Sequence, residues 1–146
     1  MNYLNIFNET LKELTDDEHL NQGSFSKAIK INRGTILGWT TGKFFPTAKT
    51  IQKIADYFHC SSDYLFGLND KRDFTPKTPP VEFITRFDAL KKENKLNDNK
   101  IAKLCDIGNS CVAKWRRFNR FPTMETLLKL TKIFNCSLEY LFGREN

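Results

Sequence analysis

The sequence lacks several features that would assign it to a common class of protein. It has only two histidines and four cysteines, with no CxxC pair and no histidine at metal-ligand spacing from a cysteine, so we expect no metal and no cofactor. No apolar run approaches the roughly 18 residues of a membrane span. The first residues also lack the basic start and apolar run of a signal peptide. These absences predict a cytoplasmic protein that has no membrane-spanning segment and whose cysteines are buried thiols; redox sensing by Cys105 and Cys111 is the alternative.

Catalytic constellations are missing as well. The sequence has no Ser/His/Asp or Cys/His arrangement and no glycine-rich loop of the kind that holds phosphate, so an enzyme is not expected and no small-molecule site is evident. What the chain does have is enough apolar side chains for a core, at 40% of its 146 residues, and 13 phenylalanines. It also has 23 Lys and Arg against 17 Asp and Glu, a net charge of +6. This excess favours an anionic partner, which could be nucleic acid, a membrane surface or an acidic protein.

The chain repeats itself with an offset of 76 residues. Residues 60–67 include Cys-Ser and Tyr-Leu-Phe-Gly, and both reappear in residues 136–143. Compared without gaps, positions 7–67 and 83–143 have 19 identities in 61 pairs. The sequence therefore predicts two copies of one small fold, in residues 1–67 and 81–146. The segment 68–80 between them holds three of the five prolines, which predicts an extended linker with a reach of about 40 Å.

Apolar residues within each copy have the spacing of five short helices. Six polar residues precede these runs at positions suited to N-caps, and a glycine follows the last helix of each copy, where a left-handed residue can end it. The N-caps expected are Asn21, Thr47, Ser61, Asn97, Thr123 and Ser137, and the terminating glycines are Gly67 and Gly143. For the first four helices of the first copy, in order, the apolar stripes expected are Phe7, Leu11, Leu14; Phe25, Ala28, Ile29; Ile36, Trp39; and Ile51, Ile54, Ala55, Phe58. For the second copy they are Phe83, Phe87, Leu90; Ile101, Leu104, Cys105; Val112, Trp115; and Leu127, Leu130, Phe134.

Two of these helices, joined by a tight turn and followed by a loop to a proline, have the organisation of a helix-turn-helix. Residues 20–46 and 96–122 resemble the Cro/cI-type (XRE, lambda-repressor-like) family in the polar start of helix 2, the apolar turn residue and the Ile-x-x-Trp or Val-x-x-Trp of helix 3. The Pro-Thr before helix 4 and the closing Cys-Ser-x-x-Tyr-Leu-Phe-Gly match too. The resemblance implies an all-α fold of two tandem five-helix lambda-repressor-like helix-turn-helix domains joined by a Pro-containing linker.

The resemblance also implies which residues meet DNA. Ile36 and Trp39, or Val112 and Trp115, face the core, so the opposite side of helix 3 is free for the major groove. In the family, bases are read from the first two positions and the sixth of this helix, which here are Arg33, Gly34, Gly38 and Asn109, Ser110, Lys114. The full set of candidate DNA-binding residues is Asn109, Ser110, Lys114, Arg116, Arg117, Asn119 and Arg120 in the second copy, and Gln22, Arg33, Thr35 and Lys43 in the first.

The two copies differ in charge. Residues 1–73 hold nine basic and nine acidic side chains, whereas residues 74–146 hold fourteen and eight, so the whole excess of +6 belongs to the second half. Residues 109–120 contribute four bases and no acid, and we expect these four charges to be uncompensated. Neutralised phosphates release counterions and so strengthen binding, which makes the second copy the expected principal reader.

Two positions depart from the family pattern. The family often has an acid after the tryptophan, where this sequence has Thr40 and Arg116, so an internal ion pair is expected to be lost. Gly42 suits the end of the first recognition helix, but its counterpart is Phe118. Asn119 is therefore expected to take the left-handed conformation that ends the second.

These observations leave several functional hypotheses open. The leading one is a sequence-specific regulator of transcription that binds double-stranded DNA and is expected to act as a repressor. In this hypothesis, a linker of about 40 Å lets both copies sit on one face of DNA, where successive major grooves are roughly 34 Å apart. The alternative makes the first copy a protein-interaction or dimerisation module, whose partner could be a second copy of the chain. Phe44, Phe45, Phe118 and Phe121 could form an apolar patch for such a partner. Non-specific packaging of nucleic acid would use the same charge.

Overall fold

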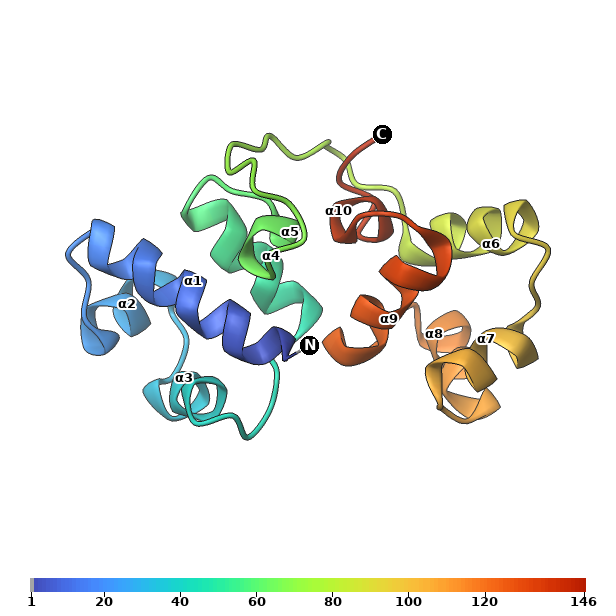
Figure 1. Cartoon of the computed structure of the whole chain (residues 1–146), viewed down its shortest axis with the longest axis horizontal. Helices are drawn as coiled ribbons and strands as arrows, with labels where there is room; N and C mark the ends of the chain where they lie inside the picture. The colour runs from blue at the N-terminus through green and yellow to red at the C-terminus, as the bar shows by residue number, and fades with distance from the viewer. Residues whose placement is uncertain (1) are drawn as a thin grey trace. The chain divides into compact units, whose positions relative to one another are not determined.

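A computed structural model describes residues 2–146, which form two compact units of helices (Figure 1). Unit 1 is Met1–Thr75 and unit 2 is Pro76–Asn146. Within the described residues the only β-pairing is an isolated bridge between Cys60 and Asp73. Unit 1 contains α1 (Tyr3–Asp17), α2 (Gln22–Ile29), α3 (Arg33–Thr40), α4 (Ala48–Tyr57) and α5 (Ser62–Leu65), and unit 2 contains α6 (Phe83–Glu93), α7 (Asp98–Cys105), α8 (Asn109–Phe118), α9 (Met124–Phe134) and α10 (Leu138–Leu141).

Side-chain caps explain where most of these helices begin. All six N-caps expected from the sequence are confirmed, because each side-chain oxygen accepts a hydrogen bond from the backbone N–H three residues on. Each such bond satisfies a donor that the first turn of a helix leaves unpaired. Gly67 and Gly143 have φ of +69° and +73°, which confirms the left-handed residues expected after α5 and α10.

The core of unit 1 is centred on Phe7, which is fully buried. Its ring lies edge-on to Trp39 at 6.1 Å and stacks on Phe66 at 5.4 Å, so α1 is joined to α3 and to the end of α5. The prediction that Trp39 is a core residue is confirmed by its 1% exposure. Aromatic pairs of this geometry add roughly 0.5–1.5 kcal/mol each to the free energy gained from burial.

Unit 2 has a similar aromatic core around Phe87 and Trp115, whose ring centroids are 5.5 Å apart. Phe83 lies edge-on to the same tryptophan at 5.9 Å. The apolar stripes of α2 and α7 were predicted incorrectly at one position each: Ala28 is exposed, and Leu104 is 49% exposed. In α7 the buried residues are Ile101, Ala102 and Cys105, so the helix is rotated to bury Ala102 in place of Leu104, and in α2 only Phe25 and Ile29 are buried.

The segment predicted as a linker is held at both ends. On the side of unit 1, Asp73 forms the bridge to Cys60, and the Arg72 guanidinium donates to the Phe58 carbonyl. On the side of unit 2, the Lys77 and Val81 N–H groups donate to the carbonyls of the tail residues 144 and 143 at 2.7 and 2.9 Å. The reach of about 40 Å, which assumed thirteen extended residues, is therefore wrong, because only residues 74–76 lie between these attachments.

Candidate nucleic-acid interface

A tight turn joins the second and third helices of each unit. The turn begins at Lys30 in unit 1 and at Asp106 in unit 2, both left-handed with φ near +60°. The next residue is an isoleucine whose N–H donates back to a carbonyl of the preceding helix, at 3.1 Å for Ile31 and 3.0 Å for Ile107. This turn fixes the direction in which α3 leaves α2 and α8 leaves α7.

Helix α8 buries one side and exposes the other. Val112 and Trp115 are 1% and 5% exposed, as the spacing predicted, and they fix the rotation of the helix about its axis. The opposite side carries polar and basic side chains that are exposed to solvent. The exposed candidates on α8 and its exit are Asn109, Ser110, Lys114, Arg116, Arg117, Asn119 and Arg120.

The end of α8 is shaped by two residues that replace the glycine of unit 1. Asn119 is left-handed, with φ 47° and ψ 52°, and its N–H donates to the Trp115 carbonyl, which confirms its predicted role. Phe118 is 52% exposed, and the guanidinium groups of Arg117 and Arg120 lie over its ring, 5.3 and 5.1 Å from the centroid. Cation–π contacts of this kind hold both arginines at the exit of the helix.

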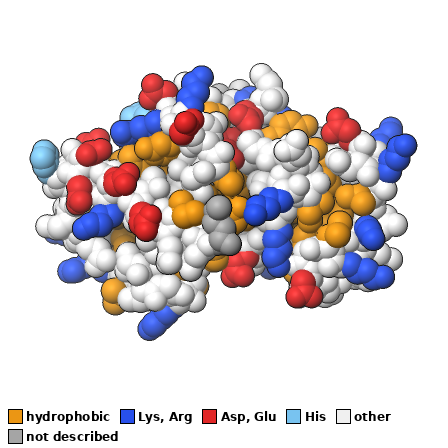
Figure 2. Space-filling view, viewed as in Figure 1, with side chains coloured by type: hydrophobic (Ala, Val, Ile, Leu, Met, Phe, Trp, Pro, Cys, Tyr) orange, Lys and Arg blue, Asp and Glu red, His pale blue; other side chains and the backbone are white. Residues whose placement is uncertain are grey.

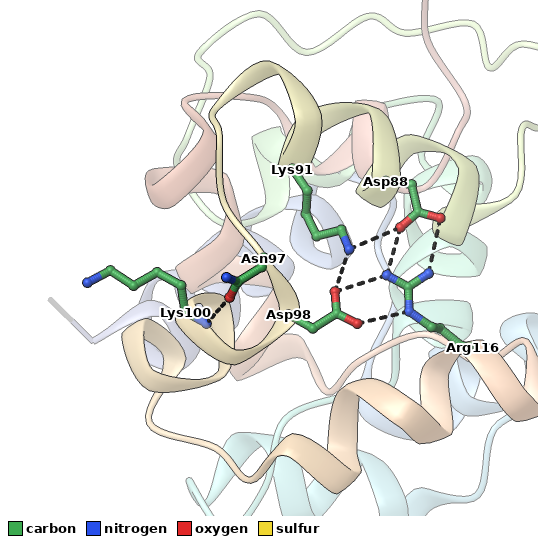
Figure 3. A network of polar contacts seen from close by, with 6 residues as sticks. All are labelled: Asp88, Lys91, Asn97, Asp98, Lys100 and Arg116. Atoms are coloured by element: carbon green, nitrogen blue, oxygen red, sulfur yellow. Dashed lines mark hydrogen bonds and ion pairs between the residues drawn. The ribbon is translucent and has the colours of Figure 1, made fainter.

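Arg116 differs from the other bases of α8 because it is bound to two carboxylates (Figure 3). Its guanidinium forms bidentate hydrogen bonds with Asp88 of α6, at 2.7 and 3.0 Å, and with Asp98 of α7, at 3.0 and 3.1 Å. Lys91 of α6 also pairs with both acids. We call these four residues the ionic cluster. The expectation that Arg116 is uncompensated is wrong, since the fold brings two acids from other helices to it.

The ionic cluster also corrects the expectation that an internal ion pair is lost after the tryptophan. The pair is present in unit 2, with a base at position 116 where the family often has an acid. Asp98 begins α7, and a carboxylate there is unsuited to contact a phosphate. It binds Arg116 instead and so ties α7 to α8. The sequence contained a signal for this pairing: relative to the first copy, Gln22 becomes Asp98 where Thr40 becomes Arg116. Sequence reasoning missed Asp88 and Lys91.

Charge-assisted hydrogen bonds in the ionic cluster lower the pKa of both acids. The bonds from Arg116 are the main cause for Asp88 and for Asp98, with Lys91 adding to the effect and partial burial opposing it. The same bonds raise the pKa of Arg116. Asp88, Asp98 and Arg116 therefore stay charged over the physiological range, and α6, α7 and α8 remain tied together.

Replacing Arg116 by glutamine should lower the stability of unit 2 and flatten its dependence on pH. A carboxylate with a lowered pKa stabilises the fold above its ordinary pKa of 3.8 and loses that effect as pH falls through the folded value. Because Asp88 and Asp98 are 48% and 37% exposed, we expect a loss of only about 1 kcal/mol near pH 7. Denaturant unfolding from about pH 7 to pH 3 measures it. Parallel pH profiles for the two proteins would contradict this role.

The corresponding face of unit 1 is apolar at its centre. Gly38 was expected to face DNA, but it is buried: a Cβ placed there would lie 2.1 Å from the Phe44 ring. Phe44 itself is 47% exposed, and Leu37, which precedes Gly38 on α3, is 52% exposed. The loop phenylalanine therefore covers the position that Lys114 has in unit 2, because glycine leaves room for its ring.

The candidate residues of unit 1 lie on α2, on α3 and in the loop that follows α3. Arg33, Thr35 and Lys43 are exposed, and the Arg33 guanidinium lies close to the start of α2, 3.9 Å from where a Cβ on Gly23 would be. Gln22 is half-buried and lines a cavity between α1, α2 and α3. Figure 2 shows acidic and basic side chains interspersed over the helices of unit 1, in keeping with its balanced charge.

Residues 2–146 contain neither a metal-binding cluster nor a membrane-spanning helix. No group of three or more His, Cys, Asp and Glu side chains is placed to hold a metal ion within this range. None of the helices in the described part of the chain is both long enough and apolar enough to cross a membrane. Burial raises the pKa of the Cys105 thiol.

Comparison with known families identifies the class of unit 1. Residues 10–71 match the Cro/C1-type HTH DNA-binding domain, and this range includes α2, the left-handed turn and α3. The family is one of DNA-binding domains rather than of enzymes, so unit 1 carries a helix-turn-helix domain without a catalytic role. The matched range ends within the segment 68–80 and does not extend into unit 2.

A characterised relative gives the same class. The chain is 30% identical over 60 residues to the HTH-type transcriptional regulator ImmR of Bacillus subtilis (strain 168). The match covers 41% of this chain and 47% of the relative, so about half of the relative's length is involved. No solved structure matches the chain significantly.

Proposed function

We propose that this protein is a regulator of transcription that binds double-stranded DNA, with α8 of unit 2 as its principal reader of the major groove. The observation that carries the proposal is the exposed face of α8. There Asn109, Ser110 and Lys114 are opposite the buried Val112 and Trp115. Asn pairs well with adenine and Lys with guanine in the major groove, so this face has side chains suited to reading sequence.

Charge supports the same assignment. Lys114, Arg117 and Arg120 have no carboxylate partner within 4 Å among the described residues, whereas Arg116 is bound within the ionic cluster. Three free bases on and beside one helix suit contacts with phosphate. We propose that Arg116 positions α8 rather than touching DNA. For the remaining candidate, Asn119, we propose that its left-handed backbone ends α8 and that its side chain lies near the phosphates.

The extension of the DNA-binding class to unit 2 is part of the proposal. It is supported by the 19 identities in 61 aligned pairs and by the same order of five helices in both units. Unit 2 also shares the left-handed residue between its second and third helices. The similarity to a transcriptional regulator and the resemblance of both copies to repressor domains favour repression as the mode of action.

A second function for unit 1 is favoured by the Phe44 and Leu37 side chains on its helix-turn-helix. An exposed apolar pair suits a protein partner better than a groove lined with phosphates, and the net charge of residues 1–73 is zero. In this alternative, unit 1 is a protein-interaction or dimerisation module, and Gln22, Arg33, Thr35 and Lys43 make at most auxiliary contacts with DNA.

The proposal can be tested by selecting DNA from a random pool with the full chain. We expect enrichment of a defined site, and we expect a substitution of Lys114 to change the preferred base at one position of it. Glu125→Ala, an acid near the start of α9 in the same unit, serves as a control that should leave the selected site unchanged. Enrichment of no particular sequence would instead favour non-specific packaging.

A further inference from the structure

Phe118, the last residue of α8, is an exposed aromatic side chain in the basic stretch 109–120. It is 52% exposed and stands where unit 1 has Gly42, so the fold that the two units share does not need a ring there. Both ring contacts that Phe118 makes in the described part of the chain are with guanidinium groups. Those of Arg117 and Arg120 lie 5.3 and 5.1 Å from its centroid, within the roughly 6 Å over which a cation and a ring attract each other.

Helix geometry does not produce these two contacts by itself. Residues one or two positions apart on a helix point in different directions, so Arg120 would lie away from Phe118 if α8 continued. The helix ends instead at Asn119, whose backbone is left-handed with φ 47° and ψ 52°. This turn brings the guanidinium of Arg120 over the ring, while Arg117 reaches the same ring through its long side chain.

A ring can hold an arginine in place without cancelling its charge. Arg116 is the contrast, because the two carboxylates of the ionic cluster both hold it and compensate its charge. The guanidinium groups of Arg117 and Arg120 form no hydrogen bond or ion pair with any of the described residues. Their N–H donors therefore remain available to an acceptor outside the chain, and a planar guanidinium is well suited to the oxygens of a phosphate.

We propose that Phe118 is a positioning residue of the DNA interface, whose ring holds Arg117 and Arg120 ready for phosphate groups of the DNA backbone. This inference rests on the proposed function, since it requires that α8 binds DNA. Binding normally costs free energy because long side chains lose conformational freedom at the interface. Two arginines that are already held by a ring lose less of it when they meet phosphate. We expect this ordering to raise the affinity for DNA about fivefold.

The test compares Phe118→Leu with Phe118→Tyr in the full chain, by fluorescence anisotropy on the selected duplex at one fixed salt concentration. Leucine keeps an apolar side chain but has no ring, whereas tyrosine keeps a ring that attracts cations. We expect about a fivefold loss of affinity for the leucine variant and the original affinity for the tyrosine variant. Tyr57→Leu is the control, because Tyr57 is an aromatic residue of α4 that is 40% exposed, and the same change there should leave the affinity unaltered.

A double-mutant cycle shows whether the ring acts through the arginines. In a chain that carries Arg117→Ala and Arg120→Ala, Phe118→Leu should cause no further loss of affinity. The same fivefold loss in that background would mean that the ring contacts DNA itself, and would overturn the proposal.

The outcome for Phe118 is separable from the outcome for the proposed function. If the unsubstituted chain selects no duplex, the proposed function fails. If it binds its duplex tightly and Phe118→Leu binds equally well, only the positioning role fails. NMR of the free chain gives a readout that needs no DNA: the δ-proton resonances of Arg117 and Arg120 should be shifted by the ring and should lose that shift in Phe118→Leu. Unchanged resonances would refute the contact.

Discussion

Replacing Lys114 and Arg117 together by alanine is expected to lower the affinity for a selected DNA site by about 100-fold or more. A good base contact contributes roughly 1–3 kcal/mol, and each lost phosphate contact weakens binding through the counterions that are no longer released. We therefore also expect the slope of log affinity against log salt concentration to fall in magnitude by about 1 for each phosphate contact removed. Fluorescence anisotropy with a labelled duplex at several salt concentrations measures both effects.

Arg33→Ala is the matched test in unit 1, since residue 33 begins α3 as Asn109 begins α8. We expect its effect to be no more than about threefold, because the centre of that face is covered by an apolar ring and the remaining contacts are exposed. An equal or larger loss from Arg33→Ala would contradict the assignment of α8 as principal reader. Circular dichroism of each variant establishes that the helices are retained.

The largest expected effect on stability comes from Gly143→Ala. The glycine has φ +73°, and a Cβ there would lie 1.7 Å from the Val81 carbonyl oxygen. The obstacle is backbone that is itself hydrogen-bonded to residue 143, so the whole segment before α6 must move. We expect a loss of at least about 3 kcal/mol, measured by denaturant unfolding together with hydrogen exchange of peptides from residues 83–142.

Gly67→Ala separates the two causes of this loss. Gly67 is the equivalent residue of unit 1, with φ +69°, but a Cβ there would meet only the Ile6 side chain, at 3.0 Å. The left-handed backbone alone costs an alanine about 1–2 kcal/mol, and we expect a loss of that size in unit 1. If both substitutions cost the same, the close approach of Val81 to a Cβ at residue 143 adds nothing to the cost.

The local features of the fold were the most predictable from the sequence. N-caps were predicted correctly because Asn, Ser and Thr accept from the backbone within the same turn, so no distant residue is involved. The same reasoning held for Asn119, which is one of few residue types that adopt a left-handed conformation readily. Trp39 and Trp115 were also placed correctly, since apolar spacing on a helix identifies the face that is buried.

What the sequence did not predict depends on side chains that meet across helices. The partners of Arg116 are 28 and 18 positions away, and neither belongs to a local motif. Helical periodicity predicted the side of α3 on which Gly38 lies, but it did not predict that the Phe44 ring covers this position. The cavity of unit 1 could not be predicted for the same reason. It depends on the distances between three helices, and the apolar spacing within one helix does not give those distances.

The ionic cluster limits how the two halves of this chain can exchange parts. A recombination that moved α8 into unit 1 would bring a guanidinium to the position of Thr40, where Lys12 and Gln22 stand in place of the two acids. The reverse exchange would leave Asp88 and Asp98 facing each other with Lys91 alone. Under the proposed function, substitutions on the exposed face of α8 would change DNA preference without disturbing the ionic cluster, whereas an exchange of α3 and α8 between the copies would break it.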